Sequence, residues 1–282
     1  MKKIRFQLFF TFMIVFLCMN GLFILPVFAE VVSKDKLANY LKSAAEGDAT
    51  AQYNLGVCYV NGYGVEKDFK KAIVWYRKAA DQGYAKAQYN LGFHYRNGWG
   101  VPKDFKQAKH WYHKASDQGN ATAQNNLGLC YHNGWGVPKD VKQAVHWYRK
   151  SAAQGYRRAK NNLGVCYYHG SGVPKDFKQA VLWYSKAADQ GLAEAQLSLG
   201  FCYYDGKGVP KDFKQAKYWF QKAADQGLAG AQMSLGCCYY DGEGVPKDFK
   251  QAKYWFQKAA AQGNMDAKKH LKLLEKNYFM EK

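Results

Sequence analysis

The chain has 282 residues, of which 41 are Lys or Arg and 22 are Asp or Glu, so its formal net charge is +19. A charge of this sign favours acidic partners, namely anionic lipid headgroups, polyanionic glycans, nucleic acid or acidic protein surfaces. Much of it belongs to one lysine pattern repeated six times (Lys103, Lys106 and Lys114 in one copy), which is also typical of a solvated face. The sequence shows no paired carboxylates, Ser/His/Asp set or phosphate-binding glycine loop, which argues against an enzyme.

Residues 1–29 differ from the rest of the chain. Three basic residues among the first five precede the almost unbroken apolar run 8–28, and Ala29 completes a small-residue cleavage site. We therefore expect a secretory signal peptide and a periplasmic or secreted protein. The alternative is an uncleaved anchor in the inner membrane, because about 20 apolar residues can span a bilayer. In that case only this segment is expected to touch the membrane.

The remaining sequence is dominated by a repeat of 36 residues. Six blocks follow one another without a gap: 48–83, 84–119, 120–155, 156–191, 192–227 and 228–263. A fixed period of this length is the signature of a solenoid, in which each unit buries its apolar face against its neighbours. The flanking segments 30–47 and 264–282 resemble a lone second helix and a lone first helix. We expect them to cap the two open ends.

Each block has the pattern of two helices. In block 84–119, apolar residues at four-residue spacing around Leu91 form one face of a first helix. The run 97–102 (NGWGVP) ends that helix, because glycine allows left-handed backbone and proline cannot continue a helix. Asp104 then stands as the N-cap of a second helix, which ends at Gly119.

A glycine stands in the middle of every first helix, where it costs about 1 kcal/mol relative to alanine. The six glycines are Gly56, Gly92, Gly128, Gly164, Gly200 and Gly236. Their recurrence predicts a close approach of the two helices, with the Trp111-type ring filling the space beside the gap. The expected architecture is all-α, a right-handed stack of antiparallel helix pairs.

The recurring run LGxxYxxGxGVxKDxxxAxxWYxKAAxxG resembles the Sel1-like repeat, a relative of the tetratricopeptide repeat with a longer inter-helix loop. The resemblance covers residues 48–263 in six tandem copies. It implies a right-handed α-solenoid and a non-enzymatic interaction scaffold, such as an adaptor in membrane-associated complexes or a factor that contacts host cells. Some cysteine-rich members of the family are linked to β-lactam hydrolysis and staple the two helices of each block. This chain lacks the second cysteine of such a staple.

Cysteines and histidines give no sign of a disulfide or a metal site. The cysteines after residue 29 are Cys58, Cys130, Cys166, Cys202, Cys237 and Cys238. Five of them occupy one position of different blocks, roughly 9–10 Å apart in a stack, which exceeds the ~7 Å limit for a bridge. We expect buried small hydrophobes. His110 and His113 can offer two ligands on one helix but lack a third at usable spacing, so we expect no metal and no cofactor.

Positions that vary between blocks mark the candidate binding surface. By resemblance to tetratricopeptide proteins, several positions of the first helices face the concave groove. The aromatic, cationic and polar residues there are Tyr53, Tyr89, Phe93, Arg96, Asn125, His132 and Tyr168. Aromatic and Arg side chains are common binding anchors because they bury much area with few lost rotamers. The tenth position of a block, which Phe93 occupies, has the alternative of packing against the neighbouring block.

Two further sets of residues are candidates. Position seven of the first four blocks carries Asn54, Asn90, Asn126 and Asn162. Asparagine can grip an extended peptide backbone because its amide both donates and accepts, although a hydrogen bond between helices is the alternative. The turn tips carry Tyr63, Trp99 and Trp135. Stacking predicts a row of these rings along one edge, suited to a sugar, a peptide or a membrane, with packing between loops as the alternative.

These observations predict an exported, non-enzymatic scaffold that binds a protein or peptide on its concave face, mostly through the N-terminal half. The alternative is an envelope-polymer binder that recognises peptidoglycan or an anionic glycan through basic residues and the turn-tip rings. A third hypothesis is β-lactam hydrolysis, which the missing cysteine pairs and nucleophile disfavour. Nucleic acid is not an expected partner.

Overall fold

The structure, a computed structural model, describes residues 32–280 of the chain, so the predicted signal peptide lies outside the described residues. Fourteen helices and no strands make up this part of the chain. The helices are α2 (Lys34–Ala45), α3 (Ala49–Asn61), α4 (Phe69–Asp81), α5 (Ala85–Asn97), α6 (Phe105–Asp117), α7 (Ala121–Asn133), α8 (Val141–Ala153), α9 (Arg157–His169), α10 (Phe177–Ala188), α11 (Ala193–Asp205), α12 (Phe213–Asp225), α13 (Ala229–Asp241), α14 (Phe249–Ala261) and α15 (Met265–Met280).

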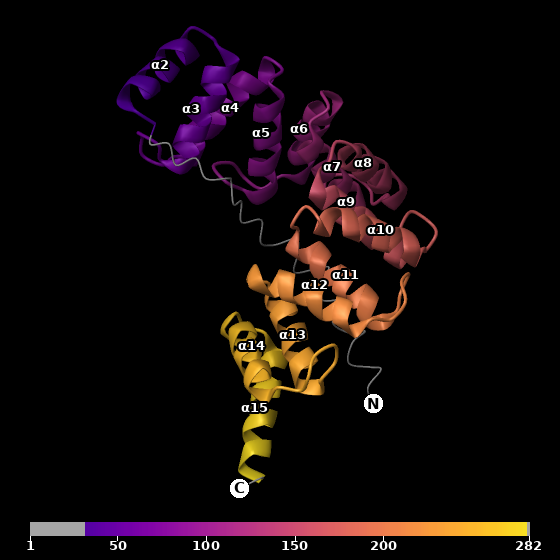
Figure 1. Cartoon of the computed structure of the whole chain (residues 1–282). Helices are drawn as coiled ribbons and strands as arrows, with labels where there is room; N and C mark the ends of the chain where they lie inside the picture. Colours follow the sequence, from indigo (N-terminus) through magenta and orange to yellow (C-terminus); the bar gives the residue numbers. More distant parts are fainter. Residues whose placement is uncertain (1–31, 281–282) are drawn as a thin grey trace.

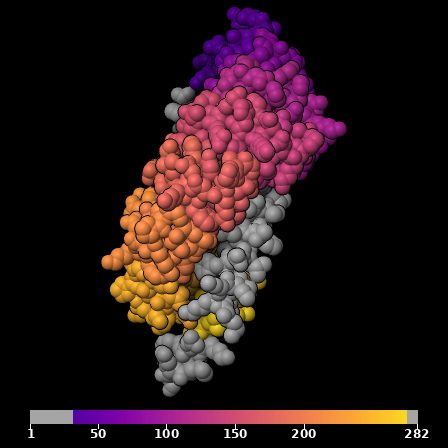
Figure 2. Space-filling model, turned by 90° about the vertical axis from the view of Figure 1, so that its right-hand side faces the viewer, coloured from indigo at the N-terminus to yellow at the C-terminus, as the bar shows by residue number. Residues whose placement is uncertain are grey.

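Consecutive helices pack on one another along the whole stack, most extensively within the pair that each block contributes. Figure 1 shows the helices following a curved path from α2 to α15, and Figure 2 shows the elongated outline of the stack. The predicted all-α solenoid of helix pairs is confirmed. Helix α2 packs on α3 at one end of the stack, and α15 packs on α14 at the other end. Between residues 32 and 280 no helix is long and apolar enough to span a bilayer.

The two helices of a pair meet where a glycine faces a buried ring. A Cβ atom placed on Gly92 would lie 2.7 Å from two ring atoms of Tyr112 and 3.0 Å from the Ala108 carbonyl oxygen. The prediction of a close approach is therefore confirmed, but the expected ring was wrong. Trp111 instead packs on the preceding block, against Ile73 and its neighbours, because one residue along a helix turns a side chain by about 100°.

A second glycine fixes how one block lies on the next. Gly100, in the turn between α5 and α6, has φ +74°, and a Cβ atom there would lie 2.5 Å from the backbone of Phe69. The turn of one block therefore rests on the start of the second helix of the block before. Only glycine satisfies both requirements, a left-handed backbone and contact with another backbone. The predicted N-cap is also present, since Asp104 Oδ1 accepts from the backbone N–H groups of Lys106 and Gln107.

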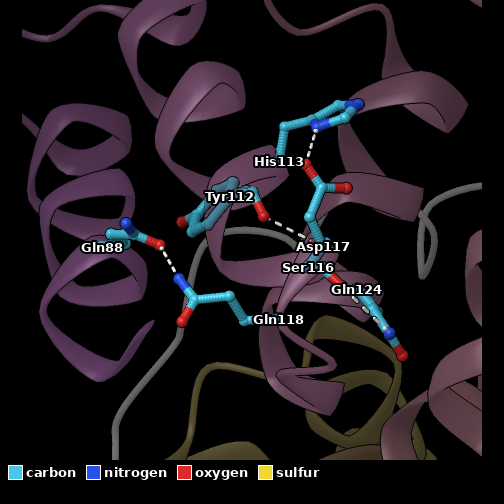
Figure 3. A network of polar contacts seen from close by, with 7 residues as sticks. All are labelled: Gln88, Tyr112, His113, Ser116, Asp117, Gln118 and Gln124. Atoms are coloured by element: carbon cyan, nitrogen blue, oxygen red, sulfur yellow. Dashed lines mark hydrogen bonds and ion pairs between the residues drawn. The ribbon is translucent and has the colours of Figure 1, made fainter. Parts of the chain in front are cut away.

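Glutamine side chains link successive blocks by a polar ladder, seen around α6 in Figure 3. Gln118 Nε2 donates to Gln88 Oε1 within one block at 2.8 Å, and Gln124 Nε2 donates to the Ser116 carbonyl of the block before at 3.3 Å. The receiving glutamine is buried, so its amide needs both bonds. Equivalent pairs recur in five of the six blocks: Gln82 with Gln52, Gln118 with Gln88, Gln154 with Gln124, Gln226 with Gln196 and Gln262 with Gln232.

The cysteines lie inside the stack without disulfide bonds in the described residues. Five are buried, as predicted, and Cys237 is half-buried. Burial raises the pKa of Cys130, Cys166 and Cys202 to about 12. A thiol with such a pKa stays protonated at neutral pH and is a poor nucleophile.

We expect Gly92→Ala to lower the free energy of unfolding by about 1–2 kcal/mol, because overpacking against Tyr112 outweighs the gain in helix propensity. Denaturant unfolding of the full chain measures the change. Gly230→Ala is the matched control, since its Cβ would meet only the end of the Leu197 side chain, at 3.3 Å. An unchanged midpoint for G92A would contradict the importance of the glycine contact.

The burial of His94 leads us to expect that the stability of the fold depends on pH. His94 occupies the position that is cysteine in the other five blocks, and its Nδ1 lies 2.9 Å from the Trp99 carbonyl. Burial lowers its pKa below the usual value, although the bond to Trp99 opposes this effect. The unfolded chain therefore binds a proton that the folded chain does not, so stability should be full above the ordinary pKa of about 6.5 and decrease as the pH falls below it.

We expect His94→Cys, a residue that the other blocks accept, to make this decrease shallower between about pH 6.5 and 5. Thermal or denaturant unfolding at several pH values measures it. The exposed His146 gives the control substitution, His146→Ala, which should leave the slope as in the wild type. Identical slopes for all three proteins would show that His94 does not contribute.

Candidate interaction surface

By resemblance to tetratricopeptide proteins, we expect the first helices to line the inner side of the curve, and α5, α7 and α9 are the first helices of the second to fourth blocks. Tyr89 on α5 and Tyr156 just before α9 belong to blocks separated by α7. Even so, burial and the nearby hydroxyl of Tyr156 together raise the pKa of Tyr89, and the Arg158 guanidinium lowers it. Side chains from alternate blocks can interact across a third only on the concave side. We refer to the inner sides of α5, α7 and α9 as the inner surface.

Aromatic side chains form the apolar part of this surface. Tyr89 is half-buried and its ring centroid lies 5.9 Å from that of Tyr112 and 6.5 Å from that of Phe93. Phe93 is also half-buried and meets Trp99 edge to face at 5.3 Å. Tyr53 has the same place at the N-terminal end and packs on Tyr84 at 5.2 Å. Other rings pack against these three side chains, and part of each side chain stays exposed, as in binding anchors.

The turn-tip rings pack across blocks. Trp99, 42% exposed, stacks on Phe69 of the block before, with ring centroids 5.6 Å apart. Trp135 is half-buried, stacks on Phe105 at 5.5 Å, and has the Arg96 guanidinium 4.7 Å from its centroid. Each of these tryptophans therefore has a ring of the block before on its face, which is the packing between loops that the sequence left open.

In the C-terminal half, the turn tip of a block meets the block before through a hydrogen bond instead of stacked rings. The sequence analysis did not predict this contact. Tyr168, 8% exposed, accepts a hydrogen bond of 2.7 Å from Lys207 Nζ, and Tyr204 donates one of 2.6 Å to Glu243. In both cases a tyrosine near the end of a first helix meets the turn tip of the next block. The signal was present in the sequence as charged turn-tip residues, Lys207 and Glu243, in the two blocks that follow a block with tyrosine at position thirteen.

Tyr63, the remaining turn-tip ring, lies at the N-terminal end of the stack. It is half-buried and lines a cavity of about 160 Å³ together with Lys36, Tyr40 and Asn54. This cavity lies between the end helix α2 and α3, away from the inner surface. Tyr63 and Asn54 therefore belong to a place separate from the other candidate residues.

Most of the candidate amides lie between blocks. Asn125 and Asn126 are 3% and 8% exposed, and Asn162 Nδ2 donates to Asn125 Oδ1 at 2.9 Å. This bond joins α9 to α7, so it matches the predicted alternative of a bond between helices more than a free peptide-binding ladder. Asn90 is half-buried, and its side chain lowers the pKa of Tyr53, which burial and Tyr84 raise. It too faces the block before.

His132 lies on α7, in the block between the one that carries Tyr89 and Phe93 and the one that begins with Tyr156. It is half-buried, and its Nδ1 is buried with no hydrogen-bond partner in the described residues. Burial and the charge of Lys139 lower its pKa, which favours the neutral ring. Within residues 32–280 no group of three metal-ligating side chains comes together, and His132 stands alone.

Block 156–191 departs from the others at the start of α9, another feature that sequence reasoning missed. Its residues 157–160 read RRAK where the other five blocks read Ala, a variable residue, Ala and Gln. Lys160 replaces the ladder glutamine, and its Nζ donates to Gln190 Oε1 at 3.1 Å. Arg157 donates to the Gln190 carbonyl, also at 3.1 Å. Beside them is an open cavity of about 440 Å³, lined by Ala121, Gln154, Gly155, Tyr156, Arg157 and Gln190.

A family profile described as the Sel1 repeat matches six consecutive segments: 49–84, 85–120, 121–156, 157–192, 193–228 and 229–264. Together they make up more than three quarters of the chain. The chain belongs to the Sel1 repeat family. Proteins with Sel1 repeats are generally non-enzymatic scaffolds for protein–protein interaction. Each matched segment begins one residue later than the block read from the sequence.

Solved structures are similar over most of the chain. A protective antigen of uropathogenic Escherichia coli strains, which displays an SLR fold, is 41% identical with a TM-score of 0.77; the match covers 83% of this chain and 50% of the antigen. This chain thus spans half the length of the antigen. A Sel1 repeat protein from Oxalobacter formigenes is 36% identical with a TM-score of 0.72 over 81% of this chain and 88% of that protein. No curated protein matches the chain.

An immunity protein from Pseudomonas aeruginosa shares the fold alone. It is 22% identical, with a TM-score of 0.51 over 77% of this chain and 83% of the immunity protein. The helix-pair stack is therefore common to chains that have little sequence in common. Function in such a stack is carried by the surface residues of each chain.

The break in the glutamine ladder gives a testable consequence. We expect Lys160→Gln to raise the free energy of unfolding by about 1 kcal/mol, because the amide can accept from Gln190 and donate to the carbonyl of residue 152, as in the other blocks. Denaturant unfolding measures the gain. Lys178→Gln, on the exposed side of α10 in the same block, removes the same charge and should leave stability within about 0.5 kcal/mol. A loss of stability in K160Q would show that the ladder does not form there.

Proposed function

We propose that this chain is an exported, non-enzymatic scaffold that binds a segment of a partner protein along the inner surface of α5, α7 and α9. The observation that carries the proposal is the convergence of half-exposed Tyr89, Phe93 and Tyr156 from alternate blocks on one concave face. The family supports the coarser statement, since Sel1 repeats generally mediate protein–protein interaction. Export is supported by the sequence of residues 1–29.

A concave groove of this kind suits an extended chain. The repeat presents equivalent positions at intervals of roughly 10 Å, and an extended peptide rises about 3.3 Å per residue, so every third residue of the peptide meets the next block. Rigid rings supply contact area with little loss of side-chain entropy. The frame beneath them is held by the glycine contacts and the ladder, so binding requires little rearrangement.

Binding of peptidoglycan or an anionic glycan by the turn-tip rings has less support. Tyr63 and Trp135 are half-buried, and Trp135 has Phe105 on one face and Arg96 over the ring. A sugar-binding platform needs an open aromatic face. Hydrolysis of a β-lactam has no supporting feature in the described residues either, because burial raises the pKa of the cysteine thiols.

We expect the combined substitution of Tyr89, Arg96 and His132 by alanine to reduce capture of the true partner at least about tenfold, because it removes two anchors from α5 and one from α7. Crosslinking in intact cells identifies the partner and its compartment. Purified variants of the full chain are then compared in a quantitative pull-down with that partner.

The control variant changes the same three residue types on the second helices, as Tyr218→Ala, Arg149→Ala and His146→Ala, all at exposed sites. It should capture the partner as the wild type does. Circular dichroism melting of both variants separates loss of binding from loss of folding. Undiminished capture by a folded inner-surface variant would refute the proposal.

A further inference from the structure

Positive charge is concentrated in the middle of the stack. Residues 84–191, the second to fourth blocks, contain 16 Lys or Arg and five Asp or Glu, whereas the other three blocks together contain 14 and 11. The invariant lysine pattern is common to all six blocks, so it does not cause this difference. The excess comes from residues that vary, which are the ones that distinguish one surface from another.

The acidic residues are missing from the inner side in particular. The first-helix and turn segments 84–103, 120–139 and 156–175 contain no Asp or Glu, whereas the corresponding segment of each other block contains two. The five acidic residues of the middle blocks all belong to second helices or their ends: Asp104, Asp117, Asp140, Asp176 and Asp189. Asp104, Asp140 and Asp176 are N-caps whose carboxylates accept backbone N–H groups.

The cations at the start of α5 and α9 are not neutralised by acidic side chains of the described residues. No ion pair in the described part of the chain involves Lys86, Arg157, Arg158 or Lys160. Arg157 and Lys160 hydrogen-bond only to neutral oxygens of Gln190. In addition, three cations in the first turns of α9 oppose the positive end of the helix dipole, an arrangement that is unfavourable for folding.

The basic surface ends abruptly. In the next block Glu194 occupies the position of Arg158, and Asp205 occupies the position of His169. There the polar contacts are made inside the stack, as between Lys207 and Tyr168. First-helix and turn segments without an acidic residue are therefore limited to the same three blocks that carry the aromatic anchors, Tyr89 and Phe93 among them.

From this coincidence of charge and aromatic anchors, we propose that the inner surface of α5, α7 and α9 binds an extended partner segment rich in Asp and Glu, with its carboxylates held by Lys86 on α5 and Arg158 on α9. This inference rests on the proposed function and adds the chemistry of the occupant. Lys86 and Arg158 occupy the same position two blocks apart, roughly 20 Å along the stack, so they match carboxylates about six residues apart in an extended chain.

A protein segment fits this surface better than a uniformly charged polymer. The cations are few and lie among half-buried tyrosine and phenylalanine rings, which need apolar side chains between the carboxylates. Charge complementarity of this kind sets specificity and register, and its contribution weakens with salt.

The test measures binding of three labelled 12-residue peptides to the full chain by fluorescence anisotropy. One repeats Glu-Leu-Ser, so that a glutamate occurs at every third residue; the second has Gln in place of Glu; the third has the same composition as the first, with its four glutamates together at one end. We expect the first to bind at least about tenfold more tightly than the second and several-fold more tightly than the third. Equal affinity for the Glu and Gln peptides would overturn the inference.

Charge reversal on the protein locates the site. Lys86→Glu with Arg158→Glu should weaken binding of the Glu-Leu-Ser peptide at least about tenfold. Lys106→Glu with Lys178→Glu makes the same change of net charge in the same two blocks but on the exposed second helices, and it should leave affinity within about twofold. Equal losses in both double variants would overturn the inference, because they would show a general charge effect.

Two outcomes separate this inference from the proposed function. A crosslinked partner whose capture is lost in the Tyr89, Arg96 and His132 variant but is unaffected by K86E/R158E would overturn the acidic occupant and leave the scaffold function standing. A sulfated heparin oligosaccharide that binds more tightly than every peptide, and equally well to the triple variant, would overturn both, in favour of a polymer binder.

Discussion

The contact between a mid-helix glycine and a buried ring, Gly92 against Tyr112 in one block, sets the geometry on which the rest of the stack depends. Because the glycine has no side chain, the two helices of a pair come close enough for the ring to fill the gap. The neighbouring tryptophan, Trp111, is then directed to the preceding block. One close contact thus decides both how a pair is held together and which residue joins it to the next pair.

Most of the polar and aromatic side chains that a binding surface could use make contacts between blocks instead. The glutamine ladder, the turn glycines on neighbouring backbones and the tryptophans stacked on Phe69 and Phe105 all serve the stack itself. Among the candidate residues, Tyr89 and Phe93 on α5 and His132 on α7 keep part of their area exposed. The residues that recur in every block are explained by packing. We therefore expect the binding residues at positions where one block differs from the others.

The start of α9 is the largest such departure. Lys160 interrupts the ladder and, with Arg157 and Arg158, places three positive charges at a helix end that disfavours them. Five other blocks show that Ala and Gln are compatible with the same backbone. A local loss of stability that the fold does not require is what a binding site on a repeat scaffold is expected to show.

The helix pairs, their turns and caps and the solenoid class could be predicted from the amino-acid sequence, because they depend on spacings within one block and the block is written six times. The sequence also indicated Tyr89, Phe93 and Arg96 as variable inner residues. Only the tertiary structure decided that Tyr112 rather than Trp111 faces the glycine, that Asn125 and Asn126 are buried, and that the turn-tip rings rest on other rings. These outcomes depend on the rotation and curvature between successive blocks, which arise from contacts between residues 30 to 40 positions apart and leave no local pattern in the chain.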